Sequence, residues 1–285
     1  GVGPDQRVAL CMERSLELVV GLLGILKAGA AYVPLDPAYP AERLAYMLSD
    51  SAPRVALSHG AARAALESAL QGLTPTLPIV ALDRDAPVWS QTADENLDPA
   101  MLGLSSQHLA YIIYTSGSTG LPKAVGNSIC GLVNRLTWVV GAVLQDTPTV
   151  AMKTSIGFVD SVTEILQALV AGGKLVVFDT DVVRDLDLFS KKLEESRITA
   201  MVLVPSLLSQ LLELKSSVFE TIETFICSGE RLDPTLIRAF KSRYPKVRLH
   251  NFYGSSEVNG DVSAFDCTDR ADGYLVDNSV NGRPI

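Results

Sequence analysis

The sequence has few of the residues that build disulfide frameworks, zinc sites and histidine-based catalytic centres. Its 285 residues include four cysteines, at positions 11, 130, 227 and 267, and none of them belongs to a C-x-x-C pair. The three histidines, His59, His108 and His250, are scattered and accompany no nucleophile motif. We therefore expect neither a disulfide framework nor a zinc site, a Ser-His-Asp hydrolase is disfavoured, and a reduced, cytosolic protein is predicted.

The sequence also lacks an excess of positive charge and a long apolar run. It has 24 Lys and Arg against 32 Asp and Glu, a formal net charge of -8, and no Lys/Arg cluster, so a nucleic-acid-binding surface is not expected. The longest apolar run, residues 18–26, stops at Lys27 and is too short to span a bilayer. No signal peptide is recognised, and the first residue is not methionine, so we expect a fragment of a longer protein.

The residues that are present predict an α/β protein. A hydrophobic content of 47% with 20% charged residues is typical of a globular chain with one large or two modest cores. Helical and strand-like segments alternate, which predicts two doubly wound, mainly parallel sheets flanked by helices. Residues 15–28 are apolar nearly all round and predict a buried helix. Further helices are expected after Pro40 and at 132–143, 160–171, 186–196, 205–214 and 234–244, and strands at 54–58, 78–82, 108–114, 149–153, 174–178, 198–204, 221–227 and 247–253.

The most informative segment is YIIYTSGSTGLPKAV at residues 111–125. An alternating apolar strand leads into a loop of hydroxyls and glycines that ends at Lys123. Backbone N–H groups, hydroxyls and one positive charge can together bind the phosphates of a nucleotide. The loop is not a Walker loop, because G-x-x-x-x-G-K-[ST] is absent from the chain. By composition alone, an ordinary surface turn explains it equally well.

Several long motifs, taken together, resemble the acyl-adenylate-forming superfamily. The loop at 111–125 is similar to its phosphate-binding signature, although Ala124 stands where the family usually has glycine. LKAGAAYVPLDPAYPAERLAYMLSDS at 26–51 resembles a structural signature of the adenylation domains of nonribosomal peptide synthetases, whereas acyl-CoA ligases usually differ there. NFYGSSE at 251–257 resembles the adenine and metal motif, with Ser256 in place of the more frequent threonine, and GRPI at 282–285 resembles the start of the next motif.

The resemblance implies a set of nucleotide-binding residues. Thr115 and Glu257 would hold Mg²⁺, a cation that prefers oxygen ligands, and Lys123 would contact phosphate. Tyr253 would stack on the adenine. Taken alone, Glu257 would be a solvated loop carboxylate and Tyr253 a core aromatic at a strand end. The other implied nucleotide contacts are Ser116, Gly117, Ser118, Thr119, Gly120, Gly229, Glu230, Asn251, Gly254 and Ser256.

The resemblance also implies a pocket for the carboxylate substrate. Adenylation domains for α-amino acids typically have F-D-x-S-V at a helix entrance, and the aspartate binds the substrate ammonium. This chain has Phe158–Val159–Asp160–Ser161–Val162, so the acid is moved by one residue, or about 100° around a helix. With a second acid at Asp261, the set resembles β-alanine-activating domains. The other matched positions are Thr163, Val202, Ile226, Ser228, Phe252 and Gly260.

Two of these acids also have a purely structural interpretation. Aspartate just before an apolar helical run is a good N-cap, which would explain Asp160 without a ligand. Asp261 would likewise be an ordinary loop residue after Gly260.

The sequence thus predicts most of the N-terminal portion of an adenylation domain. We expect a first α/β subdomain at 1–130, a second at 131–265 and the start of a truncated β-barrel at 266–285. The implied reaction is carboxylate plus MgATP giving acyl-adenylate and pyrophosphate, followed by transfer to the phosphopantetheine thiol of a carrier protein. The family's ribose-binding aspartate and catalytic lysine would lie beyond Ile285. A stand-alone acyl-CoA-type ligase and a catalytically silent nucleotide-binding fragment are the alternatives.

Overall fold

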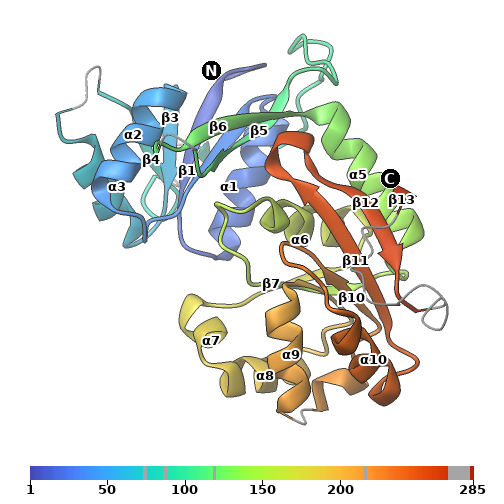
Figure 1. Ribbon diagram of the computed structural model, residues 1–285. Coiled ribbons are helices and arrows are strands. Elements are labelled where there is room, and N and C mark those ends of the chain that lie inside the picture. The colour runs from blue at the N-terminus through green and yellow to red at the C-terminus, as the bar shows by residue number, and fades with distance from the viewer. Residues whose placement is uncertain (73–75, 86–88, 91, 118–119, 215–216, 269–282) are drawn as a thin grey trace. The chain divides into compact units, whose positions relative to one another are not determined.

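The chain forms two compact units, each built on one sheet (Figure 1). The computed structural model describes residues 1–72, 76–85, 89–90, 92–117, 120–214, 217–268 and 283–285. The first unit is Gly1–Leu132 with Ser155–Phe158, and the second is Val133–Thr154 with Val159–Ile285. Most of the segment expected to start a β-barrel, 266–285, lies outside the described residues.

The first unit contains a six-stranded sheet in the order β4-β3-β1-β2-β5-β6. The first five strands are parallel, and β6 runs antiparallel to β5. The strands are β1 (Arg7–Cys11), β2 (Ala31–Leu35), β3 (Val55–Ser58), β4 (Ile79–Ala81), β5 (Leu109–Thr115) and β6 (Lys123–Ser128), and the helices are α1 (Leu16–Lys27), α2 (Ala41–Ser51) and α3 (Ala62–Leu70).

Alternation along β1 distributes these helices over the two faces of the sheet. Ala9 and Cys11 pack with α2 and α3 in one apolar cluster. Leu10 points the other way, where a Cβ on Gly21 of α1 would lie 3.1 Å from its Cδ1. Helix α1 begins after Ser15, whose hydroxyl accepts the Leu18 N–H at 3.1 Å. The prediction of a buried helix holds for one face only: α1 buries that face on the sheet and exposes Leu16 (69%) and Val20 (64%).

The second unit contains a seven-stranded sheet in the order β13-β12-β11-β10-β9-β7-β8. Strands β7 to β11 run parallel to one another, while β12 and β13 are added antiparallel at one edge. The strands are β7 (Thr149–Met152), β8 (Lys174–Val177), β9 (Ala200–Leu203), β10 (Thr224–Cys227), β11 (Arg248–Ser255), β12 (Gly260–Asp266) and β13 (Arg283–Pro284). The helices are α5 (Ile129–Ala142), α6 (Val159–Val170), α7 (Thr180–Arg184), α8 (Leu186–Glu195), α9 (Pro205–Glu213) and α10 (Pro234–Arg243), with short 3₁₀ turns η1 (Ser217–Glu220) and η2 (Ser256–Val258).

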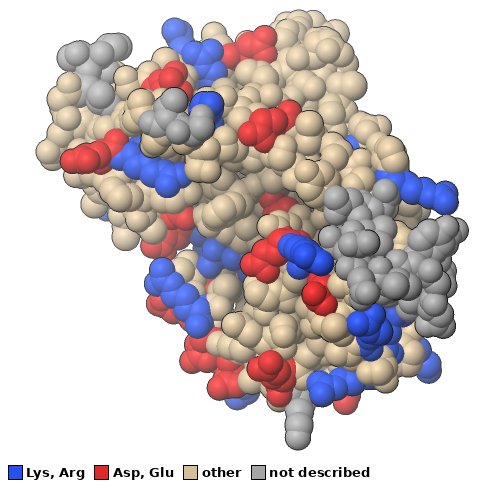
Figure 2. Space-filling model, in the orientation of Figure 1, with Lys and Arg blue, Asp and Glu red and all other residues tan. Residues whose placement is uncertain are grey.

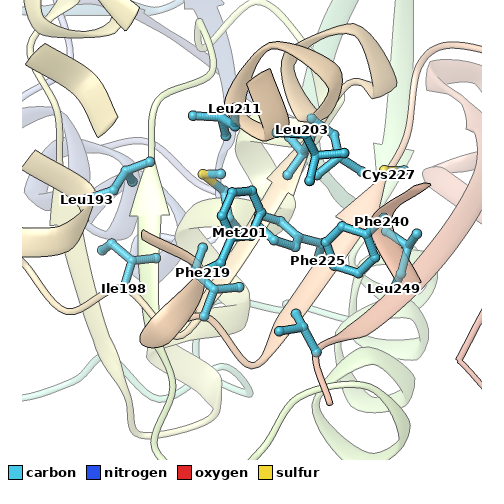
Figure 3. Packing of buried hydrophobic residues seen from close by; sticks show 14 of the residues in the cluster. Leu193, Ile198, Met201, Leu203, Leu211, Phe219, Phe225, Cys227, Phe240 and Leu249 are labelled. Carbon is cyan, nitrogen blue, oxygen red and sulfur yellow. The ribbon is translucent and has the colours of Figure 1, made fainter. Parts of the chain in front are cut away.

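The two faces of this sheet differ in character. Met201, Leu203, Phe225 and Cys227 point to one face and form an aromatic and aliphatic core with α8, α9 and α10 (Figure 3). The intervening residues of the same strands point to the other face, where they pack with α5 and α6. Residues predicted to line the substrate pocket, Val202, Ile226 and Phe252, belong to this second cluster.

The predicted α/β class with two mostly parallel sheets is confirmed. Sequence patterns did not reveal β1, β2, α3 or β6. The loop of hydroxyls and glycines between Thr115 and Lys123, called the hydroxyl loop below, is therefore the connection of an antiparallel hairpin. None of the helices in the described part of the chain is long and apolar enough to cross a membrane. Acidic and basic side chains are interspersed over the visible face in Figure 2, as the modest net negative charge leads one to expect.

Phe225→Ala is expected to destabilise the second unit strongly. Phe225 is fully buried and its ring lies 5.8 Å from those of both Phe219 and Phe240. Removing it should lower the free energy of unfolding by about 3–5 kcal/mol, measured by urea denaturation. The matched control is Phe158→Ala, because Phe158 is 62% exposed; it should cost less than about 0.5 kcal/mol. Similar losses in both variants would contradict this description of the core.

Candidate functional site

The hydroxyl loop connects two paired strand ends. Thr115 ends β5 and is paired with Lys123, the exposed first residue of β6. Gly120 has a φ of +86° and donates its N–H to the Gly117 carbonyl at 3.0 Å, so this N–H is already engaged. A Cβ on Gly117 would lie 2.0 Å from the Leu121 carbonyl oxygen, which excludes any larger residue there. Ser118 and Thr119 lie outside the described residues.

Both ends of this loop are fastened to α2. The Tyr46 hydroxyl donates to the Pro122 carbonyl at 3.1 Å. The Tyr114 hydroxyl, just before Thr115, is 2.7 Å from Asp50 Oδ2 and 3.1 Å from the Met47 carbonyl. The strand ends are thus held in place, as a loop that binds phosphate requires.

Residues predicted to surround adenine line one pocket in the second unit. The cavity, about 320 Å³, lies beyond the carboxyl ends of β10 and along β11. Tyr253 is 56% exposed, so one face of its ring is available for stacking. The volume and the exposed ring fit a purine base. The pocket is lined by Gly229, Glu230, Asn251, Tyr253 and Gly254, which were predicted to bind nucleotide, and also by Arg231, Leu232 and Phe252.

Glu230, in the lining of this pocket, makes two hydrogen bonds to the start of α9. Its carboxylate accepts the Ser206 N–H and the Ser206 hydroxyl, each at 3.0 Å. Ser206 is in the first turn of α9, where unpaired N–H groups attract a carboxylate. Gly229 has a φ of +81°, which favours glycine. Glu230 therefore ties the wall that follows β10 to a helix.

Glu257 is displayed on the hairpin between β11 and β12. It lies in η2 and is exposed, and a hydrogen bond from the Ser255 side chain lowers the pKa of its carboxyl. An ionised, solvent-facing carboxylate suits a hard cation. Glu257 and Ser256 belong to the second unit and Thr115 to the first. Within the part of the chain that the structure describes, no group of three or more His, Cys, Asp or Glu residues forms a metal site.

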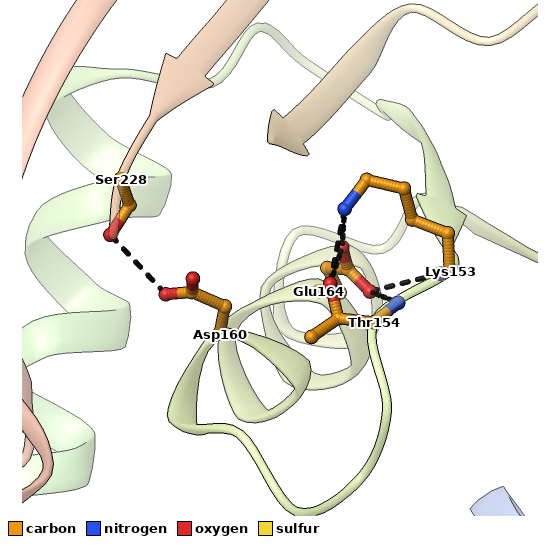
Figure 4. A network of polar contacts seen from close by, with 5 residues as sticks. All are labelled: Lys153, Thr154, Asp160, Glu164 and Ser228. Atoms are coloured by element: carbon orange, nitrogen blue, oxygen red, sulfur yellow. Dashed lines mark hydrogen bonds and ion pairs between the residues drawn. The ribbon is translucent and has the colours of Figure 1, made fainter. Parts of the chain in front are cut away.

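Asp160 lies inside the first turn of α6, which begins at Val159. Because the cap position precedes Val159, the N-cap interpretation of Asp160 is wrong. Its Oδ1 accepts a hydrogen bond of 3.4 Å from the Ser228 hydroxyl, just beyond β10 (Figure 4). A Cβ on Gly229 would lie 3.9 Å from its other oxygen. Phe158, from the same predicted pocket motif, is 62% exposed.

A buried ion pair fixes the helix that carries Asp160. Glu164, one turn further along α6, is fully buried and binds Lys153 Nζ at 3.0 Å. It also accepts the N–H groups of Lys153 and Thr154, at 3.0 and 2.9 Å, and the Thr154 hydroxyl at 2.7 Å. Four donors satisfy this one carboxylate, so α6 is locked to the end of β7 (Figure 4). Sequence reasoning missed Lys153 and Glu164.

The environment of Asp160 holds the pKa of its carboxyl at about 6, well above the ordinary 3.8. Burial is the main cause, and the negative charges of Asp261 and Glu164 add to it. Lys153 and Arg135 act in the opposite direction but do not cancel the effect. Asp160 thus lacks a full counter-charge of its own.

Asp261 has a partner that the sequence did not reveal. It is buried on β12, and its Oδ2 lies 3.7 Å from Nη1 of Arg135 on α5. Gly260, beside it, has a φ of +97°, and a Cβ there would lie 1.8 Å from the same nitrogen. Asp261 is thus a buried ion-pair partner and not an ordinary loop residue. An arginine inside a long apolar helix, LVNRLTWVV, was the available signal.

The apolar residues predicted to line the substrate pocket come from three strands, which pack with helices α5 and α6. Val202, Ile226 and Phe252 lie side by side on adjacent strands and are each at most 3% exposed. The Phe252 ring lies 5.4 Å from that of Trp138 on α5. Thr163, on α6, is also buried. The structure thus brings most of the predicted pocket residues onto one face of the second sheet.

Asp160→Asn is expected to stabilise the chain near neutral pH. Because the folded-state pKa is raised from 3.8 to about 6, ionising Asp160 opposes folding, and this cost grows as pH rises from 4 to 6. Asparagine cannot ionise, so it removes this cost. The free energy of unfolding of the variant minus that of wild type should therefore be about 2–3 kcal/mol larger at pH 7.5 than at pH 4. Chemical denaturation at both pH values measures this.

Asp233→Asn provides the matched control. Hydrogen bonds from Thr235 lower the pKa of Asp233, so the variant should gain no stability at neutral pH. An Asp160→Asn variant that is no more stable than wild type at pH 7.5 would contradict an unmatched charge at this position.

One family model matches the whole chain, and two similar proteins are peptide synthetases. The family described as AMP-binding enzyme matches residues 1–285. Phosphinothricin tripeptide synthetase PhsB of Streptomyces viridochromogenes is 39% identical over 269 residues, 94% of this chain and 22% of that protein. The beta-alanyl-bioamine nonribosomal peptide synthetase ebony of Drosophila melanogaster is 37% identical over 295 residues, 99% of this chain and 33% of that protein.

The fold is shared with a solved nonribosomal peptide synthetase. The AMPPNP-bound form of FmoA3 superposes with a TM-score of 0.86 at 24% identity, covering 100% of this chain and 29% of that one. The chain thus spans about a fifth to a third of the length of these three proteins. Since the family match covers every residue from 1 to 285, this chain belongs to the AMP-binding enzyme family.

Proposed function

We propose that the chain is the N-terminal portion of a nonribosomal peptide synthetase adenylation domain that activates an amino acid as its acyl-adenylate. The observation that carries the proposal is a pocket at the ends of β10 and β11 next to a carboxylate without a counter-charge. The pocket is lined by Asn251, Tyr253 and Gly254, and Asp160, whose charge is unmatched, lies next to Gly229 of the same lining. The similarity to PhsB and ebony over more than nine-tenths of the chain supports the same assignment.

ATP would supply the adenylyl group that the substrate carboxylate attacks. That carboxylate is already ionised at neutral pH, so the protein needs to supply position and charge neutralisation, not a base. Tyr253 would stack on the base, and Ser116, Gly117 and Lys123 would contact phosphate. Glu257 and Thr115 would hold Mg²⁺, since both offer oxygen atoms to a hard cation.

The proposed substrate is a β-amino acid such as β-alanine. Asp160 would accept the substrate ammonium, which is the counter-charge that its environment lacks. Val159, one helical step away, presents only an alkyl group where α-amino-acid domains would place the acid. Phe252, at 3% exposure, fills the pocket beside Val202 and suits a short substrate.

The proposed partner is a carrier protein whose phosphopantetheine thiol takes the acyl group, and the proposed location is the cytoplasm. Neither a nucleic acid nor a membrane is needed. Amino-acid-dependent ATP–pyrophosphate exchange by the full-length protein, across α- and β-amino acids, tests the assignment. Exchange with carboxylic acids that lack an amine would favour an acyl-CoA-type ligase, and no exchange with any acid would favour a silent nucleotide-binding module.

Asp160→Ala in the full-length protein should depress kcat/KM for β-alanine by about two to three orders of magnitude. Removing one member of a buried charge pair typically costs about 3–5 kcal/mol, because the other member is left unmatched. The measurement is the exchange rate with β-alanine against that with alanine. Val159→Asp combined with Asp160→Ala should move the preference toward small α-amino acids.

Asp185→Ala is the matched control for loss of a helix-end aspartate. Asp185 caps α8 by accepting the Leu188 N–H at 3.0 Å. Its loss should cost about 1 kcal/mol of stability and leave the substrate preference unchanged. If Asp160→Ala behaved in the same way, Asp160 would not bind the substrate.

Glu257→Gln should lower adenylation by a similar factor for every accepted acid. The change keeps the shape but removes the charge of a proposed Mg²⁺ ligand, so the loss should deepen at limiting Mg²⁺. Glu195→Gln, a surface change at a residue paired with Lys192, is the control. Wild-type rates for Glu257→Gln at limiting Mg²⁺ would remove Glu257 from the metal site.

A further inference from the structure

Arg135 is a buried guanidinium that no hydrogen bond explains. It is 2% exposed, and none of its three side-chain nitrogens has a hydrogen-bond partner among the described residues. Its one ion-pair partner there is Asp261 at 3.7 Å, beyond hydrogen-bond distance. Gly260 leaves the room that the guanidinium occupies, since a Cβ there would overlap Nη1. Such a group is costly to bury unless its charge is used.

The charge of Arg135 is balanced by a neighbouring carboxylate. Glu164 and Lys153 neutralise each other, as do Asp261 and Arg135. Asp160 is left with a neutral partner only, the Ser228 hydroxyl. Five charged groups thus leave one negative charge at the carboxyl end of β10.

We propose that Arg135 is a specificity-determining residue that neutralises Asp261, so that the pocket carries a single unmatched acid and takes a substrate with one ammonium and an uncharged side chain. The inference rests on the proposed function and names its substrate class. Arg135 acts through Asp261 and Asp160 and is therefore a positioning residue.

A different use of Arg135 would be to bind an anionic substrate side chain. Asp261 opposes this, because its carboxylate is within 4 Å of the guanidinium and would repel an incoming anion. Asp160 adds a second negative charge that acts on the same pocket. The charges therefore favour the neutralising role.

The effect can be measured through the ionisation of Asp160. The groups that act on it are Asp261 from β12, Glu164 from its own helix, Lys153 from the end of β7 and Arg135 from α5. Asp261 raises the pKa of Asp160 and Arg135 lowers it. Removing Arg135 alone should therefore raise this pKa, removing Asp261 alone should lower it, and removing both should nearly restore it.

The experiment compares Arg135→Met, Asp261→Asn, their combination and Arg135→Lys with wild type in the full-length protein. The pH dependence of kcat/KM for β-alanine, in pyrophosphate exchange, gives the midpoint below which activity is lost. In Arg135→Met this midpoint should rise by about one unit, so kcat/KM should fall about tenfold at pH 5 but only about twofold at pH 7. Asp261→Asn should lower it. The double variant and Arg135→Lys should return to near the wild-type midpoint.

A structural role for Arg135 would give another pattern. Arg135→Met and the double variant would lose activity equally, with unchanged midpoints, and that result would overturn the inference. Acceptance of an acidic amino acid by wild type, lost in Arg135→Met, would overturn it in favour of anion binding. If Arg135→Met did not fold, the Asp261→Asn midpoint would still decide. Wild-type exchange with no amine-bearing acid would overturn the proposed function itself, whereas exchange with β-alanine and unmoved midpoints would overturn this inference alone.

Discussion

One carboxylate without a counter-charge, that of Asp160, constrains the architecture of the second unit. A partly buried acid with a pKa near 6 is unfavourable for folding, so the elements around it have to be fixed by other contacts. Glu164 provides them on the same helix, with four donors from Lys153 and Thr154. One acid on α6 is fully satisfied and holds the helix, and the other, a single turn away, has no ion-pair partner among the described residues. The contacts of Glu164 thus offset the unfavourable burial of Asp160.

The parallel sheet brings the candidate nucleotide pocket close to Asp160. Strands β10 and β11 are neighbours, and their carboxyl ends carry Ser228 and Gly229 on one and Tyr253 and Gly254 on the other. A bulge between Tyr253 and Gly254 re-aims the end of β11, and the Gly254 backbone lies so close to Gly260 that no side chain fits between them. Ligands at such strand ends are a general property of open α/β sheets. Here the residues that follow β10 both line the pocket at β11 and contact Asp160.

Local patterns predicted the fold class and most strands because buried parallel strands are continuous apolar runs and their helices have clear ends. They failed at β6, where Lys123, Ala124 and Val125 carry no alternating pattern, and its antiparallel pairing with β5 is a tertiary effect. Motif resemblance found Asp160 and Asp261. It could not find Arg135 or Glu164, because each is explained only by a partner 126 or 11 residues away in the sequence (261 − 135 and 164 − 153). The N-cap interpretation failed by one residue, which is the scale on which helix ends are set by tertiary contacts.

The unpaired polar groups of the second unit lie on one side of its sheet. Among its described residues, buried side-chain atoms without a hydrogen bond occur on Arg135, Thr163, Gln167, Arg248 and His250. Arg135 is on α5, Thr163 and Gln167 are on α6, and Arg248 and His250 alternate with Leu249 on β11, on the side of Phe252. The opposite face, covered by α8, α9 and α10, is a close-packed apolar and aromatic core. Each unsatisfied group costs about 1–3 kcal/mol, so the core on the side of α8, α9 and α10 has to offset the cost of the polar groups that lie among Val202, Ile226 and Phe252 on the other side. A sheet can carry this division, because successive residues of each strand face opposite ways.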